Sequence, residues 1–315
     1  MARRALITGA TGFLGGHLIQ ALDRDGWTLT ALVRSRERWR AAGPMPQRVE
    51  VLEADLGSDA PPSGRLEAVD VVFHLAAAGT HHRPTDTLEE LLKVNVLGTQ
   101  RAIELARCLQ ARRFIYLGSC AEYGAGSFLT EDQPLAPRSL YGISKAAAGQ
   151  AAQVLGPQAG LEVVWLRAFT PFGSHAPAGS LMADVIHHAL EGRDIPLTAG
   201  DQRRDFLYVD DLIEALKLAA VHSQAAGRIL NVCTGRETSV RDVVDLILRV
   251  MGHPVRPLFG ALPYRHGEPG SVSGHPGNAR QVLGWTAKTS LETGVRQTVE
   301  WYRQRHHAAA AALTR

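Results

Sequence analysis

The stretch Ala5-Leu6-Ile7-Thr8-Gly9-Ala10-Thr11-Gly12-Phe13-Leu14-Gly15-Gly16-His17-Leu18 decides the fold. An apolar run ends in glycines spaced Gly-x-x-Gly-x-x-Gly, and a pattern of helical period follows from Leu18. A strand, a glycine turn and a helix start let the backbone approach a ligand closely, and the helix N-terminus offers unpaired N–H groups and a positive dipole end. This combination suits a pyrophosphate. The spacing differs from the Gly-x-Gly-x-x-Gly of the dinucleotide fingerprint, but its position still predicts a dinucleotide site. Its expected contacts are Gly9, Thr11, Gly12, Phe13, Leu14 and Gly15.

The composition of the chain excludes several classes of protein. The 315 residues are 45% hydrophobic and 21% charged, which is enough for a large α/β unit with an elaboration. The net charge of +3 forms no basic block, so we expect no nucleic-acid partner. No apolar run approaches the roughly 18 residues that span a bilayer, and no charged-then-apolar segment opens the chain. We therefore expect no membrane partner and a cytoplasmic location. The cysteines Cys108, Cys120 and Cys233 are scattered, so we expect neither a disulfide framework nor a metal site.

A second strand is expected at 28–33, and Arg34 follows it. In a βαβ nucleotide unit, the residue at this strand end reaches the adenosine ribose, where a carboxylate accepts from a free 2′-hydroxyl and arginine accommodates a 2′-phosphate. Arg34, helped by Arg36 or Arg38, therefore favours NADP, with NAD as the alternative.

Further strand ends contribute small or polar residues. A third strand at 49–53 leads to Asp55 and Leu56, where Asp55 either hydrogen-bonds the adenine amino group or caps the turn. The apolar strand 69–75 has the character of a strand inside a parallel sheet. Leu75, Ala76 and Ala77 at its end would let a cofactor lie against it. A helix at 88–109 contains Asn95, whose amide sits among apolar neighbours and so needs a specific partner.

Tyr141 and Lys145 are the candidates for proton chemistry. Four residues apart on a helix they share one face, so the ammonium lies near the phenol and favours its ionised form. They follow Ser119, which stands at the end of a strand at 114–117.

Together these motifs resemble the extended short-chain dehydrogenase/reductase family of nucleotide-sugar epimerases, dehydratases and ketoreductases. The resemblance covers nearly the whole chain. Besides the glycine turn, it is carried by Asp55-Leu56, His74-Leu75-Ala76-Ala77, 95–99, Ser119 with Tyr123-Gly124, Tyr141-x-x-x-Lys145, 166–173, 204–211, 231–235 and Leu283-Gly284-Trp285. It implies an α/β fold: a doubly wound parallel Rossmann sheet with a smaller C-terminal substrate lobe. The NAD(P)-binding domain would comprise 1–168 and 205–236, with short elements around 204–209 and 229–232 returning to the sheet. The substrate lobe would comprise 169–204 and 237–307, and 308–315 would form a frayed tail.

The resemblance also implies roles for single residues. Tyr141 would be the acid/base, Lys145 would lower its pKa from near 10 and hold the nicotinamide ribose, and Ser119 would hydrogen-bond the reacting oxygen. Asn95 would belong to the cofactor site. The substrate, a nucleotide-diphosphate sugar, would meet Ser119, Cys120, Thr170, His175, Arg204 and Arg265, the two arginines at its diphosphate. A homodimer through helices at about 88–109 and 141–155 is implied as well.

The residues at positions 120 and 121 limit which reactions of the family are expected. Cys120 and Ala121 stand where a 4,6-dehydratase has Asp-Glu, so dehydration is disfavoured. A 3,5-epimerase-reductase of the GDP-fucose synthase kind has cysteine where Ala121 stands, although His175 fits its second requirement.

Two reactions remain. Arg34, and Thr170 at a position where epimerases commonly carry asparagine, favour NADPH-dependent reduction of a 4-keto-6-deoxy nucleotide sugar. The alternative is an NAD-dependent 4-epimerase like UDP-glucose 4-epimerase. A dinucleotide-binding protein without turnover is disfavoured because Tyr141, Lys145 and Ser119 are all present.

Overall fold

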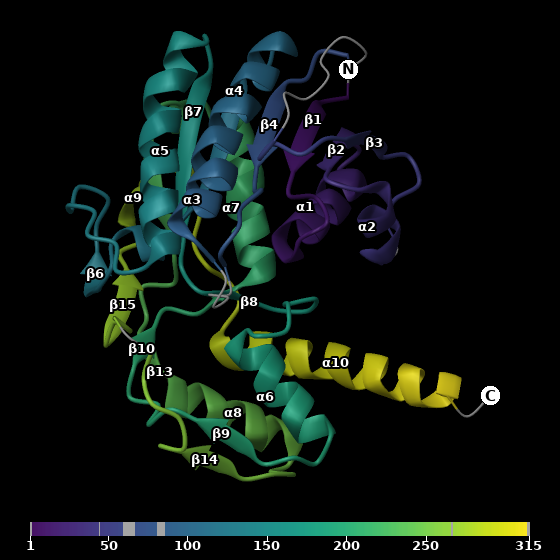
Figure 1. The fold of residues 1–315 in the computed structure, drawn as a ribbon, viewed down its shortest axis with the longest axis vertical. Helices are drawn as coiled ribbons and strands as arrows, with labels where there is room; N and C mark the ends of the chain where they lie inside the picture. The colour runs from purple at the N-terminus through teal and green to yellow at the C-terminus, as the bar shows by residue number, and fades with distance from the viewer. Residues whose placement is uncertain (1, 44, 59–66, 81–85, 266, 314–315) are drawn as a thin grey trace.

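The protein is described by a computed structural model that covers residues 2–43, 45–58, 67–80, 86–265 and 267–313. A parallel sheet flanked by helices forms the upper part of the molecule, and a lobe built around α6, α8 and α10 lies below it (Figure 1). The strands are β1 Arg4–Thr8, β2 Thr28–Val33, β3 Glu50–Glu53, β4 Val71–His74, β5 Arg113–Ser119, β6 Gly126–Leu129, β7 Glu162–Ala168, β8 Pro171–Phe172, β9 Ile195–Leu197, β10 Arg203–Arg204, β11 Leu207–Tyr208, β12 Ile229–Val232, β13 Thr238–Ser239, β14 Pro257–Phe259 and β15 Ser271–Gly274. The helices are α1 Phe13–Arg24, α2 Arg36–Ala41, α3 Leu88–Leu92, η1 Lys93–Leu97, α4 Gly98–Cys108, η2 Cys120–Glu122, α5 Leu140–Gln158, α6 Leu181–Leu190, α7 Val209–Val221, η3 Ser223–Ala225, α8 Val240–Met251, α9 Gly277–Leu283 and α10 Leu291–Leu313.

The main sheet has seven strands in the order β12-β7-β5-β4-β1-β2-β3, and all of its neighbours pair in parallel. The order reverses direction beside β1, because the chain first builds outward to β3 and then continues from β4 on the other side. Ligands bind open parallel sheets at the carboxyl ends of the strands on either side of such a reversal. The expected doubly wound parallel sheet is confirmed.

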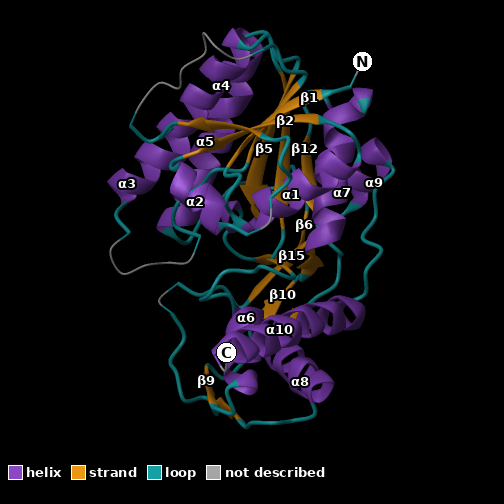
Figure 2. Ribbon diagram, turned by 90° about the vertical axis from the view of Figure 1, so that its right-hand side faces the viewer, coloured by secondary structure: helices purple, strands orange, loops and turns teal. Residues whose placement is uncertain are grey.

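The strands alternate between two hydrophobic cores, because successive side chains point to opposite faces. Ile7, Phe73 and Val164 face the core shared with α1 and α7, whereas Leu6 and Trp165 face the core shared with α4 and α5. The two helical layers lie on opposite faces of the sheet (Figure 2).

Small sheets connect the main sheet to the lower lobe. Strands β13, β10, β15 and β6 form a second sheet, β11 pairs with β8, and β14 pairs with β9. The expected return of 229–232 to the main sheet is confirmed by β12. For 204–209 it is wrong, because Arg204 belongs to the second sheet and Leu207–Tyr208 pairs with β8.

Two helices differ from the sequence expectation. The helix at 88–109 begins at a capping box of Thr87 and Glu90 and contains a π-turn, η1, between α3 and α4. The chain after 308, expected as a frayed tail, continues α10 to Leu313. Within the described residues, no helix is both long and apolar enough to cross a membrane.

Candidate functional site

The glycine turn between β1 and α1 is packed too tightly for side chains. Gly9 has φ +69°, and a Cβ there would lie 2.7 Å from the Ala76 nitrogen. A Cβ on Gly15 would overlap the Gly9 carbonyl oxygen, while Gly12 donates its N–H to that same oxygen at 3.0 Å. Gly12 is also the N-cap of α1, and no side chain of the described part of the chain caps this helix. The turn thus presents bare peptide groups and a helix N-terminus to the adjacent cleft.

A cleft of about 600 Å³ runs along the carboxyl ends of the strands from this turn. Nearly all of the residues expected at a dinucleotide line it: Gly9, Thr11, Gly12, Phe13, Leu14, Gly15, Arg34, Asp55, Leu56, Leu75, Ala76, Ala77 and Lys145. The cleft extends from the glycine turn to Lys145, and the N-terminus of α1 at one end has no side-chain cap. These features fit a dinucleotide whose pyrophosphate lies at the N-terminus of α1. Asp55 also caps its own turn, because its Oδ1 accepts the Gly57 N–H at 2.9 Å.

Asn95 is the exception among these residues. It is buried and lies behind the cleft wall rather than in it. Its Oδ1 accepts from the Ala78 nitrogen at 2.8 Å, and its Nδ2 donates to the Ser144 Oγ at 2.8 Å and to the Ala78 oxygen. In this structure Asn95 supports the cleft from behind: its amide ties the loop after β4 to α5, and the π-turn brings it into that position.

The strand end after β2 carries an exposed Arg34 that lines the cleft. Ser35 follows it and caps α2, accepting from the Glu37 and Arg38 nitrogens. Arg36 is engaged elsewhere: it donates to the Val51 oxygen at 2.7 Å and lies 3.8 Å from the Glu53 carboxylate. Of the expected arginines, Arg34 is thus the one at the cleft.

Ser119, Tyr141 and Lys145 meet at the inner end of the cleft, all lining it. Ser119 ends β5 and Tyr141 lies in the first turn of α5, which begins at an N-cap where Ser139 accepts from the Gly142 nitrogen at 3.0 Å. The Ser119 hydroxyl lies close enough to the Tyr141 phenol to oppose the rise of its pKa. Lys145 is buried, with its Nζ 4.2 Å from the centroid of the Tyr116 ring, and Tyr116 donates its hydroxyl to the Lys145 carbonyl at 2.9 Å.

Burial sets the ionisation of this group. It lowers the pKa of Lys145 to about 8, because an ammonium loses solvation. Burial, and then the Glu122 carboxylate, raise the pKa of Tyr141 well above its usual value. The expectation that Lys145 lowers the pKa of Tyr141 is therefore wrong for the chain by itself, whose ammonium lies over the Tyr116 ring.

A second cavity of about 720 Å³ adjoins the first. Tyr141 and Thr170 line both cavities. The second cavity is also lined by the expected substrate residues Cys120, Arg204 and Arg265. Arg204 is mostly buried and forms an ion pair with Glu268, whereas Arg265 is exposed.

His175 is not in either wall. The chain turns at Gly173 and His175, with φ +154° and +61°, and the imidazole packs on the Trp301 ring at a centroid distance of 4.3 Å. This backbone turn directs the His175 ring to α10, so the structure does not place it beside the other expected substrate residues.

Some lining residues were not anticipated from the sequence. Arg138 stands directly before the Ser139 cap of α5 and lines the second cavity, and Ala176, Pro177 and Leu181 close one side of the first. Because Ser139 marks the start of a helix, the sequence could have indicated that Arg138 lies at the site. No sequence signal indicates that residues 176–181 line the first cavity. Over the described ranges, no cluster of three or more His, Cys, Asp or Glu side chains is suited to a metal ion.

Comparison with known proteins agrees with this geometry. Residues 5–233 match the model of the NAD dependent epimerase/dehydratase family. The chain is 30% identical over 315 residues to a UDP-glucose 4-epimerase of Mycolicibacterium smegmatis, covering 96% of this chain and 99% of that protein. It is 29% identical to a UDP-glucose 4-epimerase of Azospirillum brasilense, covering 98% and 94%.

Solved structures give the same picture. MoeE5 in complex with UDP-glucuronic acid and NAD superposes with a TM-score of 0.87 at 31% identity, over 96% of this chain and 99% of that one. MoeE5 has also been solved with UDP-glucose and NAD. The glycine cradle, the serine, tyrosine and lysine at the cleft and this similarity over the whole chain lead to one conclusion: the protein belongs to the NAD dependent epimerase/dehydratase family, within the extended short-chain dehydrogenases/reductases.

Proposed function

We propose that this enzyme is an NAD-dependent 4-epimerase of a UDP-linked hexose or hexuronic acid. The observation that carries the proposal is the position of Tyr141, which lines both the dinucleotide cleft and the adjoining cavity. The Tyr141 phenol can therefore contact a cofactor bound in the cleft and a sugar bound in the second cavity. Relatives that are 30% and 31% identical act on or bind UDP-glucose, and one binds UDP-glucuronic acid.

The side chains supply proton transfer at one carbon. In its ionised form, Tyr141 takes the proton of the C4 hydroxyl and later returns it, and the Ser119 hydroxyl orients the tyrosine oxygen. Ser119 also donates to the oxygen while that oxygen is a carbonyl. Lys145, already held under the cleft by Tyr116, binds the ribose hydroxyls. When bound, NAD would supply the hydride acceptor and donor for C4.

Elimination of water would need an additional acid and base beside the sugar. Cys120 has its pKa raised, mainly by burial, and Ala121 carries no titratable group. Positions 120 and 121 therefore lack the Asp-Glu pair that a dehydratase carries after the serine or threonine. Oxidation followed by reduction at the same carbon requires only the groups described above.

The cofactor is proposed to be NAD. Arg34 favours NADP from the sequence, but both complexes of the 31% identical relative contain NAD. An exposed arginine beside the ribose tolerates a 2′-phosphate without requiring one. We further propose a homodimer through α3, η1, α4 and α5, where Leu97 of η1 and Val154 of α5 are 45% and 58% exposed.

The proposal is tested with the purified enzyme incubated with NAD and either UDP-glucose or UDP-glucuronic acid. Proton NMR follows the anomeric signals, which report the C4 epimer, while absorbance at the nicotinamide band is recorded. We expect conversion to the C4 epimer with no net change in reduced cofactor. The Y141F variant should bind NAD and lose activity by about 10²- to 10⁴-fold.

The reductase stays the second candidate because Arg34 lines the cofactor cleft. It is tested with NADPH and a panel of 4-keto-6-deoxy nucleotide sugars. Stoichiometric NADPH oxidation on one of these, with no epimerisation of UDP-sugars, would overturn the epimerase proposal.

A further inference from the structure

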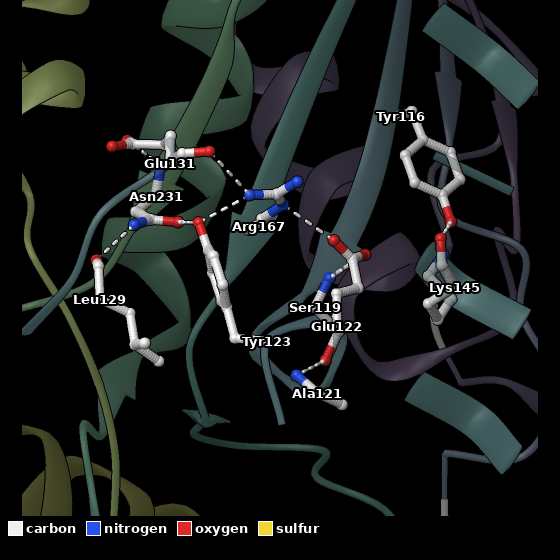
Figure 3. A network of polar contacts seen from close by, with 10 residues as sticks. All are labelled: Tyr116, Ser119, Ala121, Glu122, Tyr123, Leu129, Glu131, Lys145, Arg167 and Asn231. Carbon is white, nitrogen blue, oxygen red and sulfur yellow. Dashed lines mark hydrogen bonds and ion pairs between the residues drawn. The ribbon is translucent and has the colours of Figure 1, made fainter. Parts of the chain in front are cut away.

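Glu122 is a fully buried carboxylate directly behind the candidate catalytic groups. It ends η2, three residues after Ser119, and its Oε1 accepts the Ser119 main-chain N–H at 2.8 Å (Figure 3). The Ser119 hydroxyl in turn accepts from the Ala121 nitrogen, which completes a capping box. A Cβ on Gly118 would lie 2.5 Å from the Glu122 Oε1, so the glycine makes room for the carboxylate beneath β5.

The contacts of Glu122 favour its ionised form. Oε1 faces the Ser119 N–H, and Oε2 faces the Arg167 Nε–H at 2.9 Å. Both oxygens accept, so neither has an acceptor for a carboxyl proton of its own. Burial raises the pKa of Glu122, and the Arg167 guanidinium and the Lys145 ammonium oppose that rise.

Arg167 is itself fixed on the side remote from the cleft. Its guanidinium donates to the Tyr123 hydroxyl at 2.7 Å and lies 4.3 Å from the centroid of the Trp165 ring. Tyr123 donates to the Asn231 Oδ1, and the Asn231 Nδ2 donates to the Leu129 oxygen (Figure 3). This chain ties Glu122 through β7 to β12 and β6, so the carboxylate has no freedom to swing away from Ser119.

The charge of Glu122 acts on the groups at the cleft. It raises the pKa of Tyr141 and of Tyr116, and it opposes the lowering of the pKa of Lys145. The titratable or charged groups that interact with it are Arg167 from β7, Tyr116 from β5, and Tyr141 and Lys145 from α5. On its own segment, Cys120 interacts with Tyr141, and Tyr123 interacts with Arg167. Strand β15 also packs on η2 and contributes no titratable side chain.

We propose that Glu122 is a positioning residue of the reaction: paired with Arg167, it fixes the Ser119 main chain and places one buried negative charge behind Tyr141 and Lys145. This inference rests on the proposed roles of Ser119, Tyr141 and Lys145. The ion pair holds the Ser119 hydroxyl in place beside the Tyr141 phenol. The negative charge of Glu122 counters the positive charges of Lys145 and of the nicotinamide. The phenol therefore takes back its proton more readily than it would beside the cations alone.

The test is an E122Q variant, which keeps the shape of the side chain and removes its charge. The pH titration of Tyr141 is read as the tyrosinate absorbance difference between each protein and its own Y141F version, in the NAD complex. The complex is used because a cationic ring lowers the pKa of a nearby phenol into the measurable range. We expect the pKa of Tyr141 to fall by about one unit in E122Q. We also expect kcat to fall about tenfold or more, with a smaller change in KM, because Ser119 is displaced.

The matched control is E131Q. Glu131 accepts from the Asn231 nitrogen and the Asn278 side chain in the same network, but it is not among the groups that shift the pKa of Tyr141. E131Q should leave the tyrosinate titration unchanged. An unchanged Tyr141 titration in E122Q would overturn the proposal and leave Glu122 a purely structural residue.

A second variant provides the same test if E122Q does not fold. E122M/R167M removes the whole pair, and apolar replacement of a buried ion pair is often tolerated. Arg167 does not shift the pKa of Tyr141, so the double variant should lower that pKa as well. An unchanged or raised pKa there contradicts the proposal. The tyrosinate titration uses no sugar, so an enzyme that proves to be a reductase leaves this test intact.

Discussion

Thr8 and His74 are register partners on the adjacent parallel strands β1 and β4, and their side chains share a hydrogen bond of 2.8 Å between Oγ1 and Nδ1. The neighbours fix the tautomer. Thr99 donates its hydroxyl to the Asn95 oxygen, so its Oγ1 accepts from the His74 Nε2–H. His74 Nδ1 therefore accepts from Thr8, whose oxygen also accepts the Ala76 N–H. A neutral imidazole thus holds together the two strand ends that flank the cofactor cleft.

This relationship predicts a pH dependence of stability. Burial, and then Lys145, lower the pKa of His74 to about 3, below its unfolded value near 6.5. Protonation therefore favours the unfolded chain, so the contribution is complete above about pH 6.5 and is lost as the pH falls toward about 3. The slope attributable to His74 is about 1.4 kcal/mol per pH unit in that window. Urea unfolding at several pH values should show a smaller slope for H74Q than for the wild type. Equal slopes would contradict the assignment.

The glycine turn predicts a contrast between two neighbouring substitutions. In G15A the new methyl group overlaps the Gly9 carbonyl oxygen, so we expect NAD affinity to fall at least tenfold, together with a loss of stability. In G16A the nearest atom to the methyl group is the flexible Met45 Cε at 3.5 Å, so binding should be retained. Calorimetric titration with NAD measures both. Equal affinities in the two variants would show that the turn does not carry the cofactor.

Arg34 predicts the response to a 2′-phosphate. R34A should weaken NADP binding by about tenfold, the value of one charge-assisted hydrogen bond, and leave NAD binding unchanged. R38A is the control, because Arg38 is exposed on α2 outside the cleft wall. Fluorescence titration with both cofactors decides between the outcomes. Loss of NAD and NADP affinity alike would mean that Arg34 acts on the fold of the loop instead.

The two arginines of the second cavity are predicted to differ. Arg204 is held in place by Glu268, whereas Arg265 is exposed and must lose side-chain entropy on binding. R204M should raise the KM for the UDP-sugar by about 10- to 100-fold, and R265M should raise it less. Initial-rate kinetics on both variants provide the comparison. The reverse order would place the diphosphate nearer to Arg265.

His175 is predicted to act on stability alone. H175A removes the packing on Trp301, which is worth about 1 kcal/mol, and should leave the KM for the sugar within about twofold. T170V is the positive control, since Thr170 lines both cavities and its change should alter the KM. A large KM change in H175A would return this histidine to the sugar pocket.

Much of the fold was predictable because it depends on local patterns. The apolar run and glycines at 5–18 predict β1, the turn and α1, and the strand at 28–33 matches β2 residue for residue. The candidate site was predictable where a residue follows a strand or begins a helix, as Ser119 and Tyr141 do. Such positions are fixed by the chain that immediately surrounds them.

Other features depend on contacts between distant segments. The direction of the His175 ring follows from a left-handed backbone and from Trp301, which is 126 positions further along the chain. The pairing of Glu122 with Arg167 joins the end of β5 to β7, and neither residue belongs to a motif that implies the other. Helical spacing predicts that Lys145 shifts the pKa of Tyr141, but the Lys145 ammonium lies over the Tyr116 ring, and burial and Glu122 are the main causes of the raised Tyr141 pKa.

The π-turn at Lys93–Leu97 makes the length of this segment critical for protein engineering. Each residue of an α-helix rotates the side-chain direction by about 100°. Deleting one residue between 93 and 97 would restore regular α-helical winding. The deletion would either rotate the Asn95 side chain away from Ser144 and Ala78 or put a different residue at the position that faces them. An alignment that closes this position with a gap, or a design that idealises the helix, would therefore detach the loop after β4 from α5.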